Sequence, residues 1–243
     1  MVAIVLPTRN ESAIIRATLE QLLAFLHTHI HEDWHVVVAD NGSTDDTRTI
    51  VRDVVTHEPR VELLEIPDPG KGLAVLTAWT RARTPADSLQ LTPDAFAFMD
   101  ADLATDLRHL PELIAAIRNG ADVAIGSRYA PLSSTQRGMS RRLVSWCYRK
   151  LLRLLFGLRI TDPPCGFKAV NARVIQEVVP LVRDRQWFFD TELLIRAQVA
   201  GMCIAEIPVT WHEPRRGRSF TKVLHIILHD LRAMIRLLCE RRS

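Results

Sequence analysis

The 243-residue sequence predicts an α/β fold, with a mostly parallel sheet and helices on both of its faces. Short apolar runs of strand length alternate with amphipathic patterns of about ten to fifteen residues, which is typical of successive βαβ units. Polar clusters follow these runs, as expected where parallel strands end at a common edge. A composition of 47% hydrophobic and 24% charged residues is ordinary for a globular domain with a sizeable core.

Five apolar runs in the N-terminal half have the length and composition of strands. They cover residues 3–7, 34–40, 61–67, 95–102 and 121–128. Helical patterns between them cover residues 12–26, 44–56, 71–82 and 111–119. Because strands and helices alternate, we expect right-handed crossovers within one parallel sheet.

The C-terminal half is less regular and contains two long helical patterns, at residues 140–158 and 220–239. Both combine an apolar stripe at helical spacing with arginine or lysine. A basic amphipathic helix attracts anionic lipid headgroups. We therefore expect one domain over residues 1–218 and a membrane-interfacial helix over residues 219–243, with the protein bound peripherally to the cytoplasmic face of a membrane.

The formal net charge of +3 excludes a strongly basic nucleic-acid-binding protein but conceals a division. Residues 1–127 carry ten Lys and Arg against nineteen Asp and Glu, a net charge of −9. Residues 128–243 carry twenty-one against nine, a net charge of +12. The sequence therefore has an acidic half and an arginine-rich half, and arginine is suited to bidentate phosphate contacts.

Other classes of protein are disfavoured by what the sequence lacks. Its four cysteines form no CxxC pair, which argues against a structural zinc site or a disulfide framework and fits a reducing compartment. The sequence contains no run of about 18 uncharged apolar residues, so it predicts no membrane-spanning helix. The N-terminal apolar run passes directly into Pro7 and charged residues, so we interpret it as a strand rather than a signal peptide.

Four polar clusters stand at the ends of predicted strands, at residues 7–11, 40–43, 100–102 and 126–128. Open α/β sheets bind ligands at the carboxyl ends of their strands, so we expect these clusters to converge on one crevice. A carboxylate pair such as Asp100 and Asp102 can hold a hard divalent cation, Mg²⁺ or Mn²⁺, which in turn binds phosphate oxygens. The alternatives for this pair are a helix N-cap or a phosphatase-like DxDx(T/V) motif, which Ala104 disfavours.

Asp40 and Lys71 are two further candidates. Residues 40–46 are typical of a turn and a helix N-cap, which leaves Asp40 at the strand tip, where it can accept a hydrogen bond from a base or ribose. The Gly-Lys-Gly sequence around Lys71 lacks P-loop spacing. Lys71 is therefore either part of a turn into a helix or a contact to ligand.

Seven motifs, in their order along the chain, resemble family 2 glycosyltransferases with the GT-A fold. They occupy residues 7–11, 40–45, 70–72, 100–103, 126–129, 162–168 and 187–194. Within that family the sequence looks most like the polyprenyl-phosphate sugar transferases, the group of dolichyl-phosphate mannose synthase and dolichyl-phosphate glucosyltransferase. The resemblance runs from residue 3 to about residue 220.

This resemblance implies a site for a nucleotide sugar, UDP- or GDP-linked. The implied donor-binding residues are Pro7, Arg9, Asn10, Glu11, Asp40, Lys71, Asp100, Ala101, Asp102, Arg215 and Arg218. Within this set Asp40 would read the base, and Asp100 and Asp102 would hold Mg²⁺ or Mn²⁺ against the diphosphate. Residues 213–219 would form a loop that closes on the pyrophosphate.

The resemblance also implies polyprenyl phosphate as the acceptor, received by Arg128 together with Arg141 or Arg142. A lipid phosphate is anionic at neutral pH, so it can attack the anomeric carbon without a general base, provided that arginines compensate its charge. In relatives that attack with a sugar hydroxyl, a carboxylate in the region of Asp190 and Glu192 acts as base. Here these two residues either position ligands or form a helix N-cap.

Three residues depart from the pattern of the family. Arg9 stands where an aromatic residue is common, Ala104 where the mannose branch often has glutamine, and Phe220 where lysine often follows the serine. The sequence around the DxD motif is closer to the glucosyl branch and favours a UDP-sugar.

We therefore expect an inverting, metal-dependent hexosyltransferase whose catalytic residues are Asp102, Arg128, Asp190 and Glu192. One alternative is transfer to a saccharide or lipid hydroxyl with Asp190 or Glu192 as base. A non-catalytic sugar-nucleotide-binding membrane scaffold is a third, which the intact DxD motif disfavours. The expected partners are the nucleotide sugar, polyprenyl phosphate and a membrane surface, with a membrane protein or a second copy as further candidates and no nucleic acid.

Overall fold

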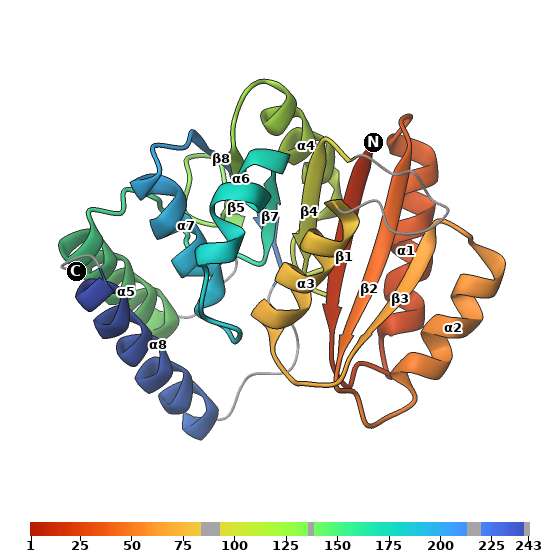
Figure 1. The fold of residues 1–243 in the computed structure, drawn as a ribbon, viewed down its shortest axis with the longest axis horizontal. Helices are drawn as coiled ribbons and strands as arrows, with labels where there is room; N and C mark the ends of the chain where they lie inside the picture. Colours follow the sequence, from red (N-terminus) through yellow and green to blue (C-terminus); the bar gives the residue numbers. More distant parts are fainter. Residues whose placement is uncertain (84–92, 136–138, 213–219, 241–243) are drawn as a thin grey trace.

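The computed structural model describes residues 1–83, 93–135, 139–212 and 220–240. Its centre is a seven-stranded sheet in the order β3-β2-β1-β4-β7-β5-β8, and β6 and β9 form a separate pair (Figure 1). The strands are β1 (Val2–Thr8), β2 (Trp34–Asn41), β3 (Val61–Ile66), β4 (Ala95–Met99), β5 (Val123–Ser127), β6 (Ser134–Thr135), β7 (Phe167–Val170), β8 (Ile204–Pro208) and β9 (Thr210–Trp211). The helices are α1 (Ile15–His29), α2 (Thr47–His57), α3 (Lys71–Arg83), α4 (Leu110–Arg118), α5 (Met139–Phe156), α6 (Ala172–Glu177), α7 (Phe189–Val199) and α8 (Phe220–Glu240), with short 3₁₀ turns at Leu107–His109 and Val179–Leu181.

The predicted α/β fold is confirmed, and each predicted strand and helix is present with its ends shifted by a few residues. The sheet is mostly parallel, but β7 runs antiparallel between β4 and β5, with Phe96 opposite Val170 on one side and Val123 opposite it on the other. Four residues are too few to show a reliable alternation in sequence, so β7 was not predicted. Its position brings the preceding loop against the end of β4, where Asp100 N donates to Gly166 O at 3.1 Å.

Two apolar layers cover the sheet. One contains the inner faces of α3, α5, α6, α7 and α8, and the other contains those of α1, α2 and α4. Strands such as β1, β2 and β4 are buried on both faces, which explains their nearly continuous apolar sequences.

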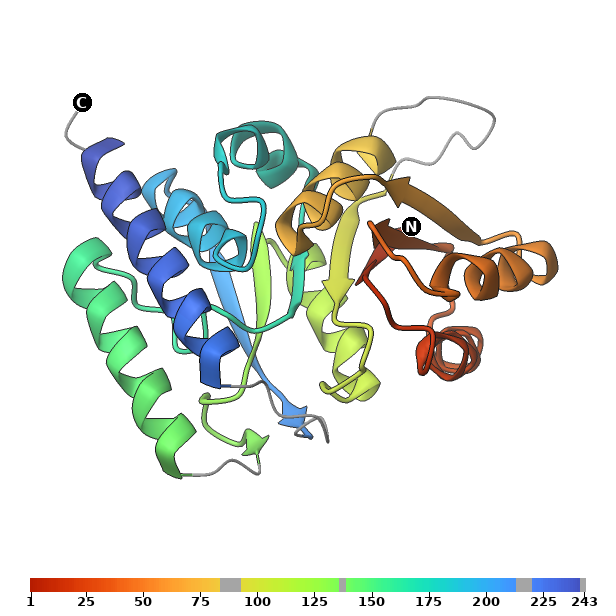
Figure 2. The same cartoon turned by 90° about the horizontal axis from the view of Figure 1, so that it is seen from below.

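Helix α8 lies beside α5 and α7 (Figures 1 and 2). Its residues Ala233, Met234 and Leu237 are buried in the core, so α8 packs as part of the same folded unit as the preceding residues. Its opposite face exposes large apolar side chains, namely Ile227, Leu228, Leu231 and Ile235. Within the described ranges, no helix combines the length and the apolar character needed to cross a membrane.

Candidate active site

The loops after β1 and β2 are joined by hydrogen bonds, as the predicted convergence requires. Asn10 has φ of 55°, in the left-handed region, and its Oδ1 accepts from Thr44 N at 2.8 Å while its own N–H donates to Ser43 Oγ at 2.9 Å. Glu11 N donates to Thr47 Oγ1 at 2.9 Å. Asn10 and Glu11 therefore fix the shape of this loop through backbone contacts.

Asp40 ends β2 and is fully buried. Its Oδ1 accepts from Arg48 Nε at 2.6 Å and from Ser43 N at 3.2 Å. Its Oδ2 is buried and has no hydrogen-bond partner among the described residues. A buried acceptor without a donor costs about 1–3 kcal/mol, so this oxygen is suited to accept an N–H or O–H from a ligand.

Four charged side chains, alternately acidic and basic, form a chain of ion pairs at the centre of the site: Asp100, Lys71, Asp190 and Lys168. Lys71 Nζ lies 2.7 Å from Asp100 Oδ1 and 3.3 Å from Asp190 Oδ2. Lys168 Nζ lies 2.6 Å from Asp190 Oδ1. Burial by itself would lower the pKa of Lys71, but the charges of Asp100 and Asp190 outweigh it and raise that pKa. Lys71 therefore stays protonated and joins the end of β4 to the start of α7.

Glycine is required at two positions of this site. A Cβ on Gly166 would overlap the Asp100 carboxylate, and a Cβ on Gly72 would lie 2.7 Å from Phe189 Cβ. Real Cβ atoms do not approach other atoms this closely. Close approach at Gly166 therefore brings the loop before β7 against the end of β4, and close approach at Gly72 brings α3 against α7.

Asp100 and Asp102 are compatible with a hard divalent cation. Asp102 Oδ1 accepts from Ala104 N at 3.1 Å, and the pKa of Asp102 is raised by partial desolvation of its carboxylate and by the charge of Asp100. Two carboxylates supply part of the oxygen shell of Mg²⁺ or Mn²⁺, and substrate phosphates and water usually complete it. Among the described residues, no cluster of three or more His, Cys, Asp or Glu could hold a metal ion by itself.

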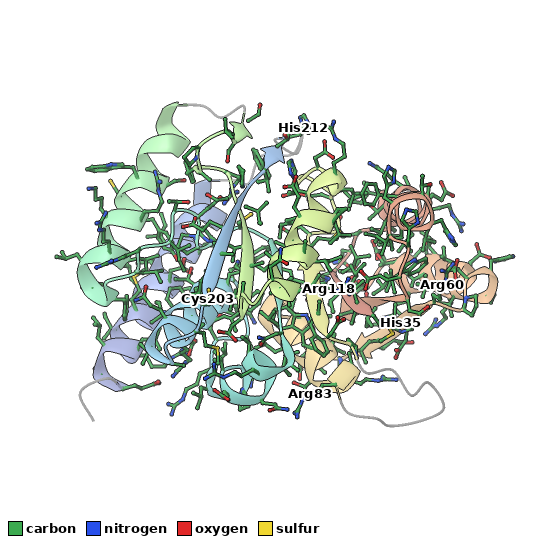
Figure 3. All side chains as sticks on the ribbon, turned by 90° about the horizontal axis from the view of Figure 1, so that it is seen from above. His35, Arg60, Arg83, Arg118, Cys203 and His212 are labelled. Carbon is green, nitrogen blue, oxygen red and sulfur yellow. The ribbon has the colours of Figure 1, made fainter. Side chains whose placement is uncertain are left out.

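His212 lies beside the DxD loop, because its N–H donates to Ala104 O at 2.8 Å. It lies on the α4 side of the sheet, whereas Arg83, at the end of α3, lies on the other side (Figure 3).

Arg128 forms a bidentate ion pair with the buried Asp162. Its Nε and Nη2 donate to the two oxygens of Asp162 at 2.6 and 2.8 Å, and its backbone N–H donates to Oδ2 at 2.9 Å. Burial by itself would lower the pKa of Arg128, but the charge and hydrogen bonds of Asp162 outweigh that effect and raise the pKa. The guanidinium is therefore charged and fixed in position. Its Cζ lies 5.5 Å from the centre of the Trp211 ring.

The other predicted basic residues are less fully described. Arg141 and Arg142 belong to α5, but their side chains are outside the described part of the structure, and so are Arg215 and Arg218 entirely. Pro7 is half-buried and Arg9 is exposed at the end of β1, and Ala101 is buried between the two DxD carboxylates.

Asp190 and Glu192 lie in different networks although both belong to the first turn of α7. Asp190 faces Lys71 and Lys168 at the centre of the site. Glu192 is fully buried and accepts from two backbone N–H groups, Arg183 and Asp184, and from two arginines, Arg196 and Arg236. The structure therefore brings Asp190 together with the DxD motif but does not bring Glu192 there.

Sequence reasoning missed three residues that build the site: Asp162, Gly166 and Lys168. All three lie in the motif at residues 162–168, which supported the family resemblance but received no chemical role. A lysine within an otherwise apolar strand was the available signal, since lysine is almost never fully buried unless it is paired.

Comparisons with known proteins agree with this geometry. A family model described as "Glycosyl transferase family 2" matches residues 3–179. Glycosyltransferase AglD of Haloferax volcanii is 37% identical over 232 residues, covering 93% of this chain and 35% of the relative. A dolichyl-phosphate beta-glucosyltransferase of Saccharomyces cerevisiae is 30% identical over 232 residues, covering 87% of this chain and 66% of the relative.

A solved structure has the same fold at low sequence identity. The glucosyl-3-phosphoglycerate synthase of Mycobacterium tuberculosis, crystallised with Mn²⁺, uridine diphosphate and glucosyl-3-phosphoglycerate, superposes with a TM-score of 0.71 at 18% identity. The match covers 99% of this chain and 80% of that one. The sequence motifs, the fold and the family match agree, and the chain belongs to glycosyl transferase family 2.

Proposed function

We propose that this chain transfers a hexose, glucose or mannose, from a UDP- or GDP-linked donor to polyprenyl phosphate with inversion at the anomeric carbon. The observation that carries the proposal is the set of charged groups Asp100, Lys71, Asp190 and Lys168 beside the DxD loop. The name of the dolichyl-phosphate glucosyltransferase relative supports the acceptor class. The chain spans about a third of the length of AglD and about two-thirds of the length of the dolichyl-phosphate beta-glucosyltransferase. The activity of the whole protein is therefore part of the proposal.

The donor side of the proposal rests on the loops after β1, β2 and β4. Asp40 Oδ2 is a buried acceptor that a base or ribose donor would satisfy. Arg9, Asn10 and Glu11 follow β1 at the same edge of the sheet, and Pro7 is the penultimate residue of that strand. Arg215 and Arg218 remain candidates for the pyrophosphate.

Asp100 and Asp102 would hold Mg²⁺ or Mn²⁺ when the donor binds. The bound cation would neutralise the diphosphate and stabilise the negative charge of the leaving nucleotide. Lys71 already compensates Asp100 and stays protonated. This chain thereby supplies a fixed positive charge beside the carboxylates, at the place where leaving-group charge develops.

The acceptor phosphate needs positive charge more than it needs a base. Arg128 is held by Asp162, so that it presents a charged guanidinium without reorganising, and Arg141 and Arg142 lie at the start of α5. The phosphate oxygen is already ionised and attacks the anomeric carbon as the nucleotide leaves. One such in-line displacement inverts the anomeric centre.

The hydroxyl-acceptor alternative requires a free carboxylate base. Both oxygens of Asp190 are paired with ammonium groups, and Glu192 is buried among four donors. Carboxylate oxygens that already accept from these donors are not free to accept the proton of an incoming sugar hydroxyl. These contacts favour the phosphate acceptor, for which no base is required.

We also propose that the protein binds peripherally to the cytoplasmic face of a membrane through the exposed apolar residues of α8. A second copy of this chain and a membrane protein are further candidate partners. A polyprenyl acceptor requires that the site approach a bilayer.

The decisive experiment uses Mn²⁺, polyprenyl phosphate and a panel of radiolabelled UDP- and GDP-sugars, followed by lipid extraction. We expect one donor to label the lipid, and Asp102→Ala to reduce the rate by at least about 100-fold because two-carboxylate coordination is lost. Full metal-dependent transfer by Asp102→Ala would overturn the proposal. Donor binding with no lipid labelled by any sugar would instead favour the non-catalytic scaffold.

A further inference from the structure

The first turn of α3, which carries Lys71, is built against residues 183–188. Gly72 N donates to Gln186 O at 3.0 Å, and Leu73 N donates to Arg185 O at 2.9 Å. Gln186 Nε2 donates to Pro69 O at 3.0 Å. The first N–H groups of a helix have no partner within it, so this turn supplies the cap of α3 and fixes where Lys71 emerges.

Two buried carboxylates hold that turn in shape. Asp184 Oδ1 accepts from Gln186 N at 2.9 Å and from Phe189 N at 3.1 Å. Glu192 accepts from Arg183 N at 3.0 Å and from Asp184 N at 2.9 Å. Asp184 is 4% exposed and Glu192 is fully buried, so water does not replace these contacts.

Helix α8 reaches both carboxylates. Arg236 Nη2 lies 2.6 Å from Glu192 Oε2, and His229 Nε2 lies 3.3 Å from Asp184 Oδ2. These two residues are seven positions apart, so they lie on one face of the helix. Glu240, in the last turn of α8, pairs with Arg196 at 2.7 Å and with Arg183 at 3.0 Å.

We infer that α8 helps to position the catalytic site through two of its residues, Arg236 and His229, which act as positioning residues. Through Glu192 and Asp184 they hold the turn at residues 183–188, and through that turn they set the position of Lys71 between Asp100 and Asp190. Glu192 thereby acts on the reaction through backbone geometry and not as a base. The role in turnover rests on the proposed transferase function, whereas the mechanical link can be tested without it.

The link is tested by amide hydrogen exchange with two matched variants of the full chain. Arg236→Gln removes the contact to Glu192, and Arg232→Gln removes the same charge from an exposed position one turn earlier. We expect Arg236→Gln to speed exchange about tenfold or more in peptides covering residues 69–74 and 183–190, with peptides from β2 and α4 unchanged. Arg232→Gln is expected to leave all of these unchanged.

The same variants are assayed for transfer to a short-chain, water-soluble polyprenyl phosphate, so that membrane binding does not contribute. We expect Arg236→Gln to lower kcat at least about tenfold with acceptor KM within about twofold, and Arg236→Lys to recover much of the loss. His229→Gln, which removes the contact to Asp184, is expected to accelerate exchange in the same two segments and provides a second variant should Arg236→Gln fail to fold.

Two results would overturn the inference: a uniform rise in exchange over the whole chain, which a merely structural helix would give, or equal behaviour of Arg236→Gln and Arg232→Gln. If the wild-type protein transfers no sugar, the proposed function fails, and the exchange experiment still decides the link between α8 and Lys71.

Discussion

Lys168 is fully buried, and its position shows how single residues hold this site together. Its ammonium group donates to Cys165 O at 2.5 Å and to Asp190 Oδ1 at 2.6 Å. A buried charge is tolerated when it is both paired and hydrogen-bonded, as here. Lys168 therefore fixes Asp190, and Asp190 in turn receives Lys71.

Substitution of Lys168 tests this pairing by stability. Lys168→Met is expected to lower the free energy of unfolding by about 3 kcal/mol, because Asp190 loses one of its two charged partners in a buried site. The double variant Lys168→Met/Asp190→Asn should recover part of the loss, since the unpaired charge is removed. Urea unfolding of the single and double variants measures both effects, and strictly additive losses would contradict the pairing.

At the scale of elements, the antiparallel strand β7 and the helix α8 decide the geometry that the βαβ pattern leaves open. β7 brings Gly166 against Asp100, and α8 brings Arg236 to Glu192. Neither contact follows from local periodicity, because each depends on which distant element packs alongside.

Asp230 on α8 gives this packing a measurable pH dependence. Burial raises the pKa of Asp230 to about 6, although hydrogen bonding to His229 opposes the shift. The native carboxyl then binds its proton more tightly than the unfolded one, whose pKa is about 3.9. The associated stability is present below about pH 4 and is lost as the pH rises through about 6.

Asp230→Asn is therefore expected to raise the free energy of unfolding at pH 7.5 by about 1–3 kcal/mol. The gain should disappear near pH 4.5, where the wild-type carboxyl is largely protonated. Thermal unfolding of both proteins over this pH range measures the difference. A gain that is the same at every pH would contradict burial of an ionised carboxylate as its cause.

At the scale of the whole molecule, the charge division follows the proposed division of labour. Residues 1–127, which are acidic overall, contain the DxD loop and the loops proposed to bind the nucleotide, and residues 128–243, which are basic overall, contain Arg128, α5 and α8. Exposed apolar residues on α5 (Val144, Trp146 and Leu154) accompany those on α8, and the two helices lie side by side (Figure 2). Both helices expose apolar side chains and also carry basic residues, as membrane-interfacial helices do.

Membrane binding is best tested by single substitutions, because deletion of α8 would also remove core residues such as Met234. Ile235→Gln and Leu228→Gln are expected to weaken sedimentation with anionic vesicles about tenfold together, with little change in Tm, since both side chains are exposed. Val199→Gln, at an equally exposed apolar position on α7, is the control. Equal sedimentation of the wild type, the Ile235→Gln/Leu228→Gln double variant and the Val199→Gln control would exclude this face of α8 as the membrane contact.

The sequence by itself determined the α/β class, the convergence of the strand-end clusters on one edge of the sheet, and the place of Asp40 and Asp100 at that edge. These follow from local periodicity and from the rule that parallel strands end together, which needs no knowledge of packing. Only the tertiary structure decided between Asp190 and Glu192, since their sequence context is the same helix turn. Asp190 meets the buried Lys168 of β7, whereas Glu192 meets Arg236 of α8. Partners more than twenty residues away in the chain are chosen by how elements pack, and that choice separated Asp190, which faces Lys71 beside the DxD motif, from Glu192, which accepts from the backbone of residues 183 and 184.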